Sequence, residues 1–138
     1  MPVTLTRTVG FRAVHRLYRP DWSEAQNRDA FGPLSEPPGH THDYRCVVTV
    51  AGPVDLPMAM VIDLAELDRI LQQEVVARLD GKHLNHDVPG LEGTIPTCEA
   101  IALDVYRRLT TRLPAGVTLE RVRIMEDPTL YADCTGLD

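Results

Sequence analysis

The spacing of the hydrophobic residues changes twice along this chain, and the change limits the folds it can adopt. Near the amino terminus, Phe11, Ala13 and His15 lie on one face of an alternating segment. The expected elements are strands at 4–17 and 44–51, helices at 63–79 and 97–113, and strands at 117–126 and 130–135. Because this β-β-α-α-β-β order lacks alternating βα units, it predicts an α+β fold: an antiparallel four-stranded sheet with two helices on one face. Oligomerisation into a larger barrel would cover the sheet edges.

Residues that favour helix ends support these boundaries. Asp63, with Glu66 three residues later, is predicted to form a capping box at the start of the first long helix. Thr97 is the predicted N-cap of the second. The segment 18–39, rich in proline, aspartate, serine and glycine, is expected to be a loop with a short helix at 23–31.

Composition argues against several classes of partner. The chain has 138 residues, with 14 Lys+Arg against 20 Asp+Glu and a formal net charge of −6, so nucleic-acid binding is not expected. Neither a signal peptide nor a membrane-spanning run is expected. The three cysteines lack a metal-knuckle spacing and predict reduced thiols in a cytoplasmic protein. The length predicts a single domain over residues 1–138.

Two closely spaced histidines indicate half of a metal site. His40 and His42 are two positions apart in an extended segment, so their side chains share a face. If the first two strands pair as a hairpin, His15 can join them, and three imidazoles with an open fourth position suit a catalytic zinc ion. The alternative is that each is an ordinary core or surface histidine, because H-x-H alone is a weak signal.

Six segments of the chain, taken together, resemble a known family over nearly its whole length. They are FRAVHRL (11–17), GHTHDY (39–44), MVIDLAELDRIL (60–71), LDGKHLN (79–85), PTCEAIA (96–102) and VRIMEDP (122–128). They resemble the 6-pyruvoyltetrahydropterin synthase and 6-carboxytetrahydropterin synthase family. The resemblance implies the tunnelling fold, trimers that pair into hexamers, and active sites formed between subunits.

The resemblance also implies roles for individual residues. The three histidines above match the family's zinc ligands, with Thr41 where a glycine is usual. Glu126 matches the carboxylate that anchors the pterin ring. A carboxylate can accept two hydrogen bonds side by side, from the ring N–H and from the amino group. Thr97 matches a pterin-contacting position, and Glu99 is placed with it among the substrate-binding residues.

The family's proton relay is altered in this chain. The usual base is a cysteine six residues before the first histidine of the pair in members with a long loop, or four before it in members with a short loop. Those positions hold Leu34 and Glu36. The supporting aspartate–histidine pair keeps Asp80 but has Gly81 in the histidine position, and His83 is the candidate to replace that histidine.

Three hypotheses follow for a pterin substrate, which the family implies to be 7,8-dihydroneopterin triphosphate. In the first, the chain is a zinc-dependent lyase in which Glu36 is the base, its pKa raised by burial under Pro37 and Pro38, and the product is 6-hydroxymethyl-dihydropterin. In the second, it is a conventional 6-carboxytetrahydropterin or 6-pyruvoyltetrahydropterin synthase. In the third, it is a non-catalytic module that binds a pterin or purine.

Overall fold

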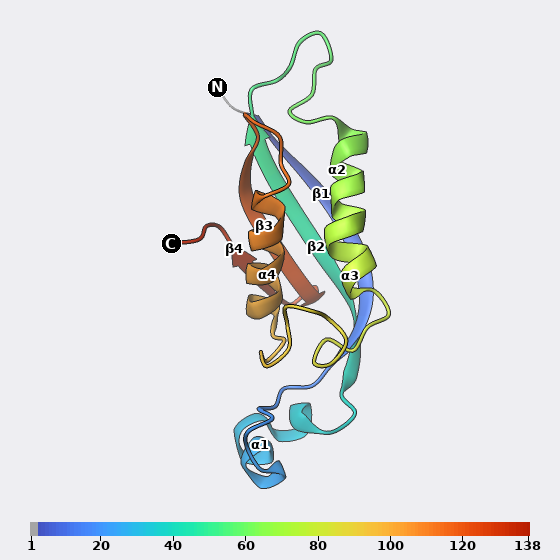
Figure 1. The fold of residues 1–138 in the computed structure, drawn as a ribbon, viewed down its shortest axis with the longest axis vertical. Coiled ribbons are helices and arrows are strands. Elements are labelled where there is room, and N and C mark those ends of the chain that lie inside the picture. Colours follow the sequence, from blue (N-terminus) through green and yellow to red (C-terminus); the bar gives the residue numbers. More distant parts are fainter. Residues whose placement is uncertain (1–2) are drawn as a thin grey trace.

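A four-stranded antiparallel sheet forms one layer of the molecule. The computed structural model describes residues 3–138, so Met1 and Pro2 of the predicted domain lie outside the described residues. The strands follow chain order in the sheet (Figure 1): β1 (Val3–His15), β2 (His40–Gly52), β3 (Thr118–Asp127) and β4 (Leu130–Cys134). Each strand pairs antiparallel with the next, which confirms the predicted sheet.

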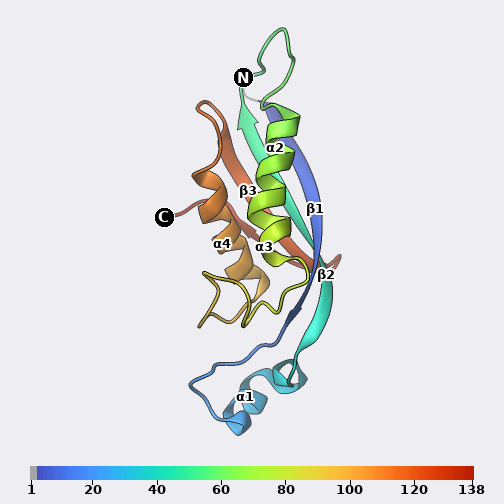
Figure 2. The ribbon, with the colours of Figure 1, turned by 45° about the vertical axis from the view of Figure 1, so that its right-hand side comes forward.

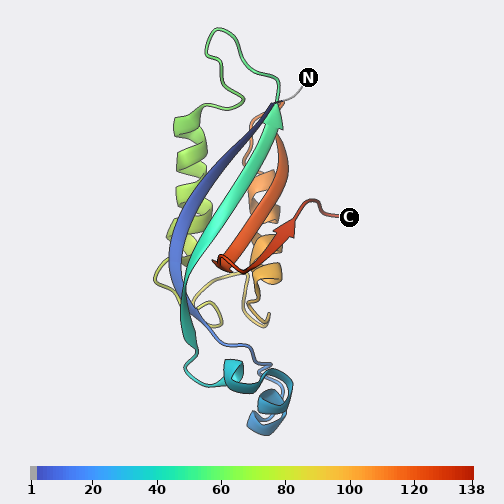
Figure 3. The same cartoon turned by 180° about the vertical axis from the view of Figure 1, so that it is seen from behind.

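The two long helical segments cover one face of this sheet, as predicted (Figures 1 and 2). The first begins as α2 (Leu64–Leu71), continues through a π-helical turn (Gln72–Val76) and ends as α3 (Ala77–Leu79). The second is α4 (Cys98–Thr110). Among the described residues, no helix covers the opposite face of the sheet, as the view from behind shows (Figure 3). Core side chains between the layers include Val48, Ile70, Leu71, Ile101, Leu109 and Ile124, each at most 1% exposed. No helix within residues 3–138 is long and apolar enough to cross a membrane.

Residues 16–39 form an arm that extends beyond the sheet at the end where β1 leaves and β2 enters (Figure 1). The arm contains α1 (Glu24–Phe31), which confirms the predicted short helix, and a 3₁₀ turn over Gly32–Ser35. A capping box starts α1: the Ser23 hydroxyl accepts from the backbone of Gln26, whose side chain accepts from the backbone of Ser23.

The structure corrects several predicted features. The capping box expected at Asp63 is wrong: Asp63 caps α2 through Ala65, while Glu66 pairs with Arg69. The first strand ends at His15 and not at residue 17, and the second begins at His40 and not at residue 44. The paired strands therefore include all three histidines. The second long helix ends at Thr110, short of residue 113, where threonine hydroxyls bond carbonyls of the last turn.

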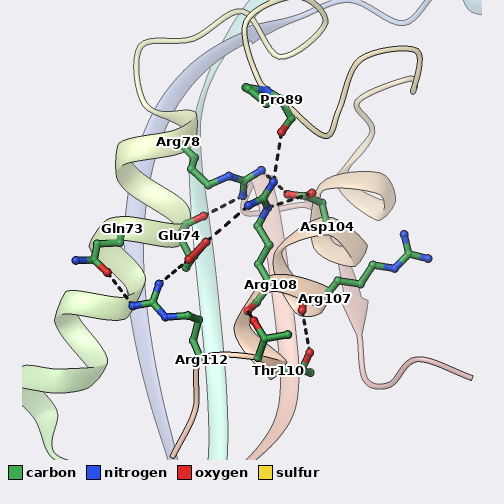
Figure 4. Close-up of polar contacts among 10 residues, drawn as sticks. Gln73, Glu74, Arg78, Pro89, Asp104, Arg107, Arg108, Thr110 and Arg112 are labelled. Carbon is green, nitrogen blue, oxygen red and sulfur yellow. Dashed lines mark hydrogen bonds and ion pairs between the residues drawn. The ribbon is translucent and has the colours of Figure 1, made fainter.

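An ion-pair network joins the two helical segments above the sheet (Figure 4). Arg78 on α3 pairs with Asp104 on α4 at 2.9 Å, and Arg112 beyond α4 pairs with Glu74 at 2.6 Å. Arg108 lies between the two carboxylates, 3.8 Å from Glu74 and 3.6 Å from Asp104. The Asp104 and Arg78 side chains are each only 15% exposed, so water screens this pair poorly.

We expect Asp104→Ala to lower the free energy of unfolding by roughly 2 kcal/mol, because the largely buried Arg78 side chain then lacks its carboxylate partner. Asp68→Ala is the control, since its pair with Arg7 has side chains 43% and 46% exposed. That loss should stay below about 1 kcal/mol. Urea unfolding at one protein concentration measures both; equal losses would show that the network adds nothing beyond a surface pair.

Candidate metal centre

The register of the first hairpin brings the three predicted histidines together. His15 is the last residue of β1 and pairs directly with His40, the first residue of β2, while Ala13 pairs with His42. The three ring centroids lie 4.5 to 5.1 Å apart. One possible ligand atom from each residue lies within 4.8 Å of the other two.

The state of the imidazole rings suits metal binding. His15 is 2% exposed, and its Nδ1 donates a hydrogen bond to the Pro96 carbonyl at 2.7 Å, which leaves Nε2 with a lone pair. Within residues 3–138, the buried Nε2 atoms of His15 and His42 have no hydrogen-bond partner. Burial lowers the pKa of His15 and of His40, so both favour the neutral form that binds a metal. These residues therefore fit a metal site with three nitrogen ligands.

The turn into β2 depends on one glycine. Gly39 has φ +120°, and a Cβ there would lie 2.5 Å from the His15 carbonyl oxygen. Only a residue without a side chain lets the chain pass this close to His15. Thr41, where the resemblance implies a glycine, is exposed and pairs with Val14, so that difference leaves the histidines in place.

A pocket of about 260 Å³ opens beside the histidines. Glu126, at the end of β3, lies with Oε2 3.5 Å from His42 Nε2, and its Oε1 accepts a hydrogen bond from the Cys98 thiol at 3.6 Å. Burial, with the nearby Glu126 charge, raises the pKa of Cys98 to about 12, so the thiol keeps its proton. The lining residues are His15, Leu17, Leu34, His40, Thr97, Cys98, Glu99, Glu126 and Leu130.

All three predicted substrate residues line this pocket, and they reach it from two elements. Thr97 caps α4, accepting from the backbone of Ala100 at 3.1 Å, and Glu99 lies in the first turn of that helix. Glu126 comes from β3. The pocket thus places carboxylates and a hydroxyl next to the three imidazoles, an arrangement able to bind a polar ring beside a metal ion.

The predicted catalytic residues are not brought into this pocket. Leu34 lines it, whereas Glu36 is exposed in the segment after the 3₁₀ turn, so the expected burial under the two prolines is wrong in this chain. The Asp80 carboxylate accepts from the Arg12 backbone at 2.8 Å. The Nε2 atom of His83 bonds the Pro38 carbonyl at 2.6 Å.

Comparison with known proteins identifies the family. A family model described as 6-pyruvoyl tetrahydropterin synthase matches residues 4–136. The chain belongs to this family. Human 6-pyruvoyl tetrahydrobiopterin synthase is 37% identical over 122 residues, which cover 88% of this chain and 83% of that protein. The protein of the same name from Drosophila melanogaster is 36% identical over 124 residues, 90% of this chain and 74% of that protein.

Solved structures agree with this family assignment. The 6-pyruvoyl tetrahydropterin synthase of Caenorhabditis elegans matches with a TM-score of 0.90 at 31% identity, covering 99% of this chain and 97% of that chain. An uncharacterized protein from Wolinella succinogenes, 19% identical with a TM-score of 0.71 over 99% of both chains, shares the fold alone. The predicted tunnelling fold is therefore confirmed.

One residue beside the three histidines was not singled out in the sequence. The Tyr44 hydroxyl is buried and has no hydrogen-bond partner within residues 3–138. Its ring stacks on Phe11 at 4.9 Å and meets the edges of His15 and His42 at 5.9 and 5.5 Å. The period of two from His42 to Tyr44 on β2 was the signal that placed it on the same face.

We expect His40→Ala to reduce bound zinc from about one equivalent per chain to well below it, because two imidazoles bind zinc less tightly than three. Elemental analysis of dialysed protein measures the metal. His86→Ala is the control, since His86 is exposed and outside the triad. A full equivalent of zinc in His40→Ala would disprove the three-histidine assignment.

Proposed function

We propose that this chain is a zinc-dependent lyase that acts on the side chain of a dihydropterin, with 7,8-dihydroneopterin triphosphate as its substrate. The observation that carries the proposal is the juxtaposition of three imidazoles with the Glu126 carboxylate in one pocket. Membership of the 6-pyruvoyl tetrahydropterin synthase family, whose members include the human and insect enzymes, supports the substrate class.

In this proposal, the pocket holds the pterin ring by its hydrogen-bond donors. Glu126 accepts from the ring N–H and amino groups, which form a fork that matches a carboxylate. Thr97 and Glu99 at the start of α4 contact the same ring. Because Glu126 lies 3.5 Å from His42, a ring held there places its side chain toward the histidines.

The three histidines would hold the metal. A zinc ion bound by His15, His40 and His42 would polarise the hydroxyls of the substrate side chain and acidify the neighbouring C–H and O–H groups. The chain's own contribution is to favour neutral His15 and His40 through burial, which lowers the pKa of both, and to orient His15 through its bond to Pro96. The substrate then loses a proton to a base of the protein.

Glu36 is the proposed base. It is the ionisable residue in the segment 33–39 that leads into His40. A glutamate is a catalytic residue of the Plasmodium vivax 6-pyruvoyltetrahydropterin synthase. That protein is 15% identical to this chain, with a TM-score of 0.64 over 97% of both chains, so the likeness shows a shared fold alone. Asp80 and His83 are proposed to support Glu36 in proton handling, His83 through its bond to the Pro38 carbonyl. With a glutamate base, the product is 6-hydroxymethyl-dihydropterin.

A non-catalytic pterin- or purine-binding module is the second candidate. It is favoured by the pocket wall, where Leu34 and not Glu36 lies beside the metal ligands. Conventional 6-carboxytetrahydropterin or 6-pyruvoyltetrahydropterin synthesis is the third. Incubation with 7,8-dihydroneopterin triphosphate and identification of the product separates the three: no pterin product would support the binding module.

We also propose that the chain is a cytoplasmic homo-oligomer, a trimer or a dimer of trimers, with one domain over residues 1–138. Two sheet edges support this: β4 pairs only with β3, and the amino-terminal part of β1 pairs only with β2, within residues 3–138. Such edges bind further strands readily. Free thiols at all three cysteines agree with a reducing compartment.

Glu36→Gln is expected to lower turnover of 7,8-dihydroneopterin triphosphate by on the order of 100-fold or more, because the amide cannot accept a proton. Bound zinc should remain at the wild-type level, since Glu36 is not one of the converging ligands. Steady-state kinetics with product detection gives the first quantity and elemental analysis the second.

A second substitution tests whether the loss is that of a base. Leu34 lines the metal pocket, so Leu34→Cys introduces a thiol there. If Glu36 acts as base, adding Leu34→Cys to Glu36→Gln should restore part of the lost turnover. Unchanged turnover in Glu36→Gln alone would exclude Glu36 as the base.

A further inference from the structure

The segment after α3 runs along the outer edge of β1, although it is not itself a strand. The Gly81 amide donates to the Arg12 carbonyl at 2.7 Å. The Val14 amide donates to the Lys82 carbonyl at 3.0 Å, and the Leu84 amide returns a bond to the Val14 carbonyl at 2.8 Å. This segment therefore closes the edge of β1 over the residues that lead to His15.

Asn85 extends this pairing beyond the end of the strand. Its side-chain carbonyl accepts from the Arg16 amide and its side-chain amide donates to the Arg16 carbonyl, both at 2.9 Å. Arg16 directly follows His15, where β1 has ended. A side chain thus replaces the missing neighbour strand for the residue next to a proposed metal ligand.

His83 reaches the other ligand-bearing segment. Its Nε2 donates to the Pro38 carbonyl at 2.6 Å, and its Nδ1 accepts from the backbone N–H of Asn85 at 3.3 Å. These two bonds require the same neutral tautomer, with the proton on Nε2. Pro38 lies two residues before His40. Residues 82–85 are therefore bonded both to the segment just before His40 and to the segment just after His15.

We propose that residues 82–85 form a clasp in which His83 and Asn85 are positioning residues for the metal triad. His15 and His40 form the terminal pair of the β1–β2 ladder, and the terminal pair of a ladder is the one most prone to open. The clasp holds the chain immediately outside that pair. The ordering of the ligands is then complete before the metal binds, which strengthens binding. This inference rests on the proposed zinc site.

The chain contains a matched control for Asn85. The Asn27 side chain makes the same two bonds to the backbone of Arg19, accepting from its amide at 2.7 Å and donating to its carbonyl at 3.1 Å. Asn27 belongs to the arm and is 3% exposed. Loss of Asn27 therefore removes the same kind of support at a place away from the histidine pair.

The test measures the zinc dissociation constant by competition with a chromophoric chelator, on full-length protein. Asn85→Ala should weaken zinc binding about tenfold, the lower end of the range for residues that orient metal ligands. Asn27→Ala should leave zinc affinity unchanged while lowering the thermal midpoint of the metal-free protein. Equal zinc affinity in Asn85→Ala and wild type, or an equal loss in both variants, would overturn the proposal.

A second pair of variants covers the case in which Asn85→Ala does not fold. His83→Ala removes the donor to Pro38 and should weaken zinc binding, whereas His83→Gln keeps an amide donor at a similar reach and should retain most of the affinity. Equal affinity in the two His83 variants would overturn the positioning role. A wild-type protein that binds no zinc would instead disprove the proposed metal site, and with it this inference.

Discussion

The pairing of β1 with β2 is the contact on which the rest of the molecule depends. It is the longest ladder in the sheet, running from the Val3–Gly52 pair to the His15–His40 pair. A slip of one residue would turn every side chain of one strand to the other face. The same register that buries Phe11 against Tyr44 therefore also directs three imidazoles to one point.

The end of this ladder is an unusual place for a site that needs fixed geometry. Strand ends open readily, yet His15 is 2% exposed and bonded to Pro96 from the α4 side. Gly39 permits the close turn into His40, and residues 82–85 occupy the outer edge. The segments that carry the three histidines are thus bonded to Pro96 and to residues 82–85, which are distant from them in the sequence.

The pocket beside the histidines is lined by carboxylates and a hydroxyl together with apolar side chains. Glu126, Thr97 and Glu99 line it, while Leu34 provides an apolar surface at one of the two positions that the resemblance assigns to a cysteine. Glu36 carries the only ionisable side chain between residues 33 and 39 but is exposed in the single chain.

Sequence alone was sufficient for the elements whose causes are local. Period-two and helical spacing predicted the sheet and its two covering helices, the i, i+2 spacing placed His40 and His42 on one face, and Thr97 was identified as a cap. Tertiary structure alone showed that Leu34 and not Glu36 lines the pocket, because a 3₁₀ turn in the arm sets which side chain faces inward. It also showed that His83 bonds the backbone of Pro38, shortly before His40, and that Asn85 bonds the backbone of Arg16, directly after His15. Such contacts join segments tens of residues apart, and no local spacing pattern encodes them.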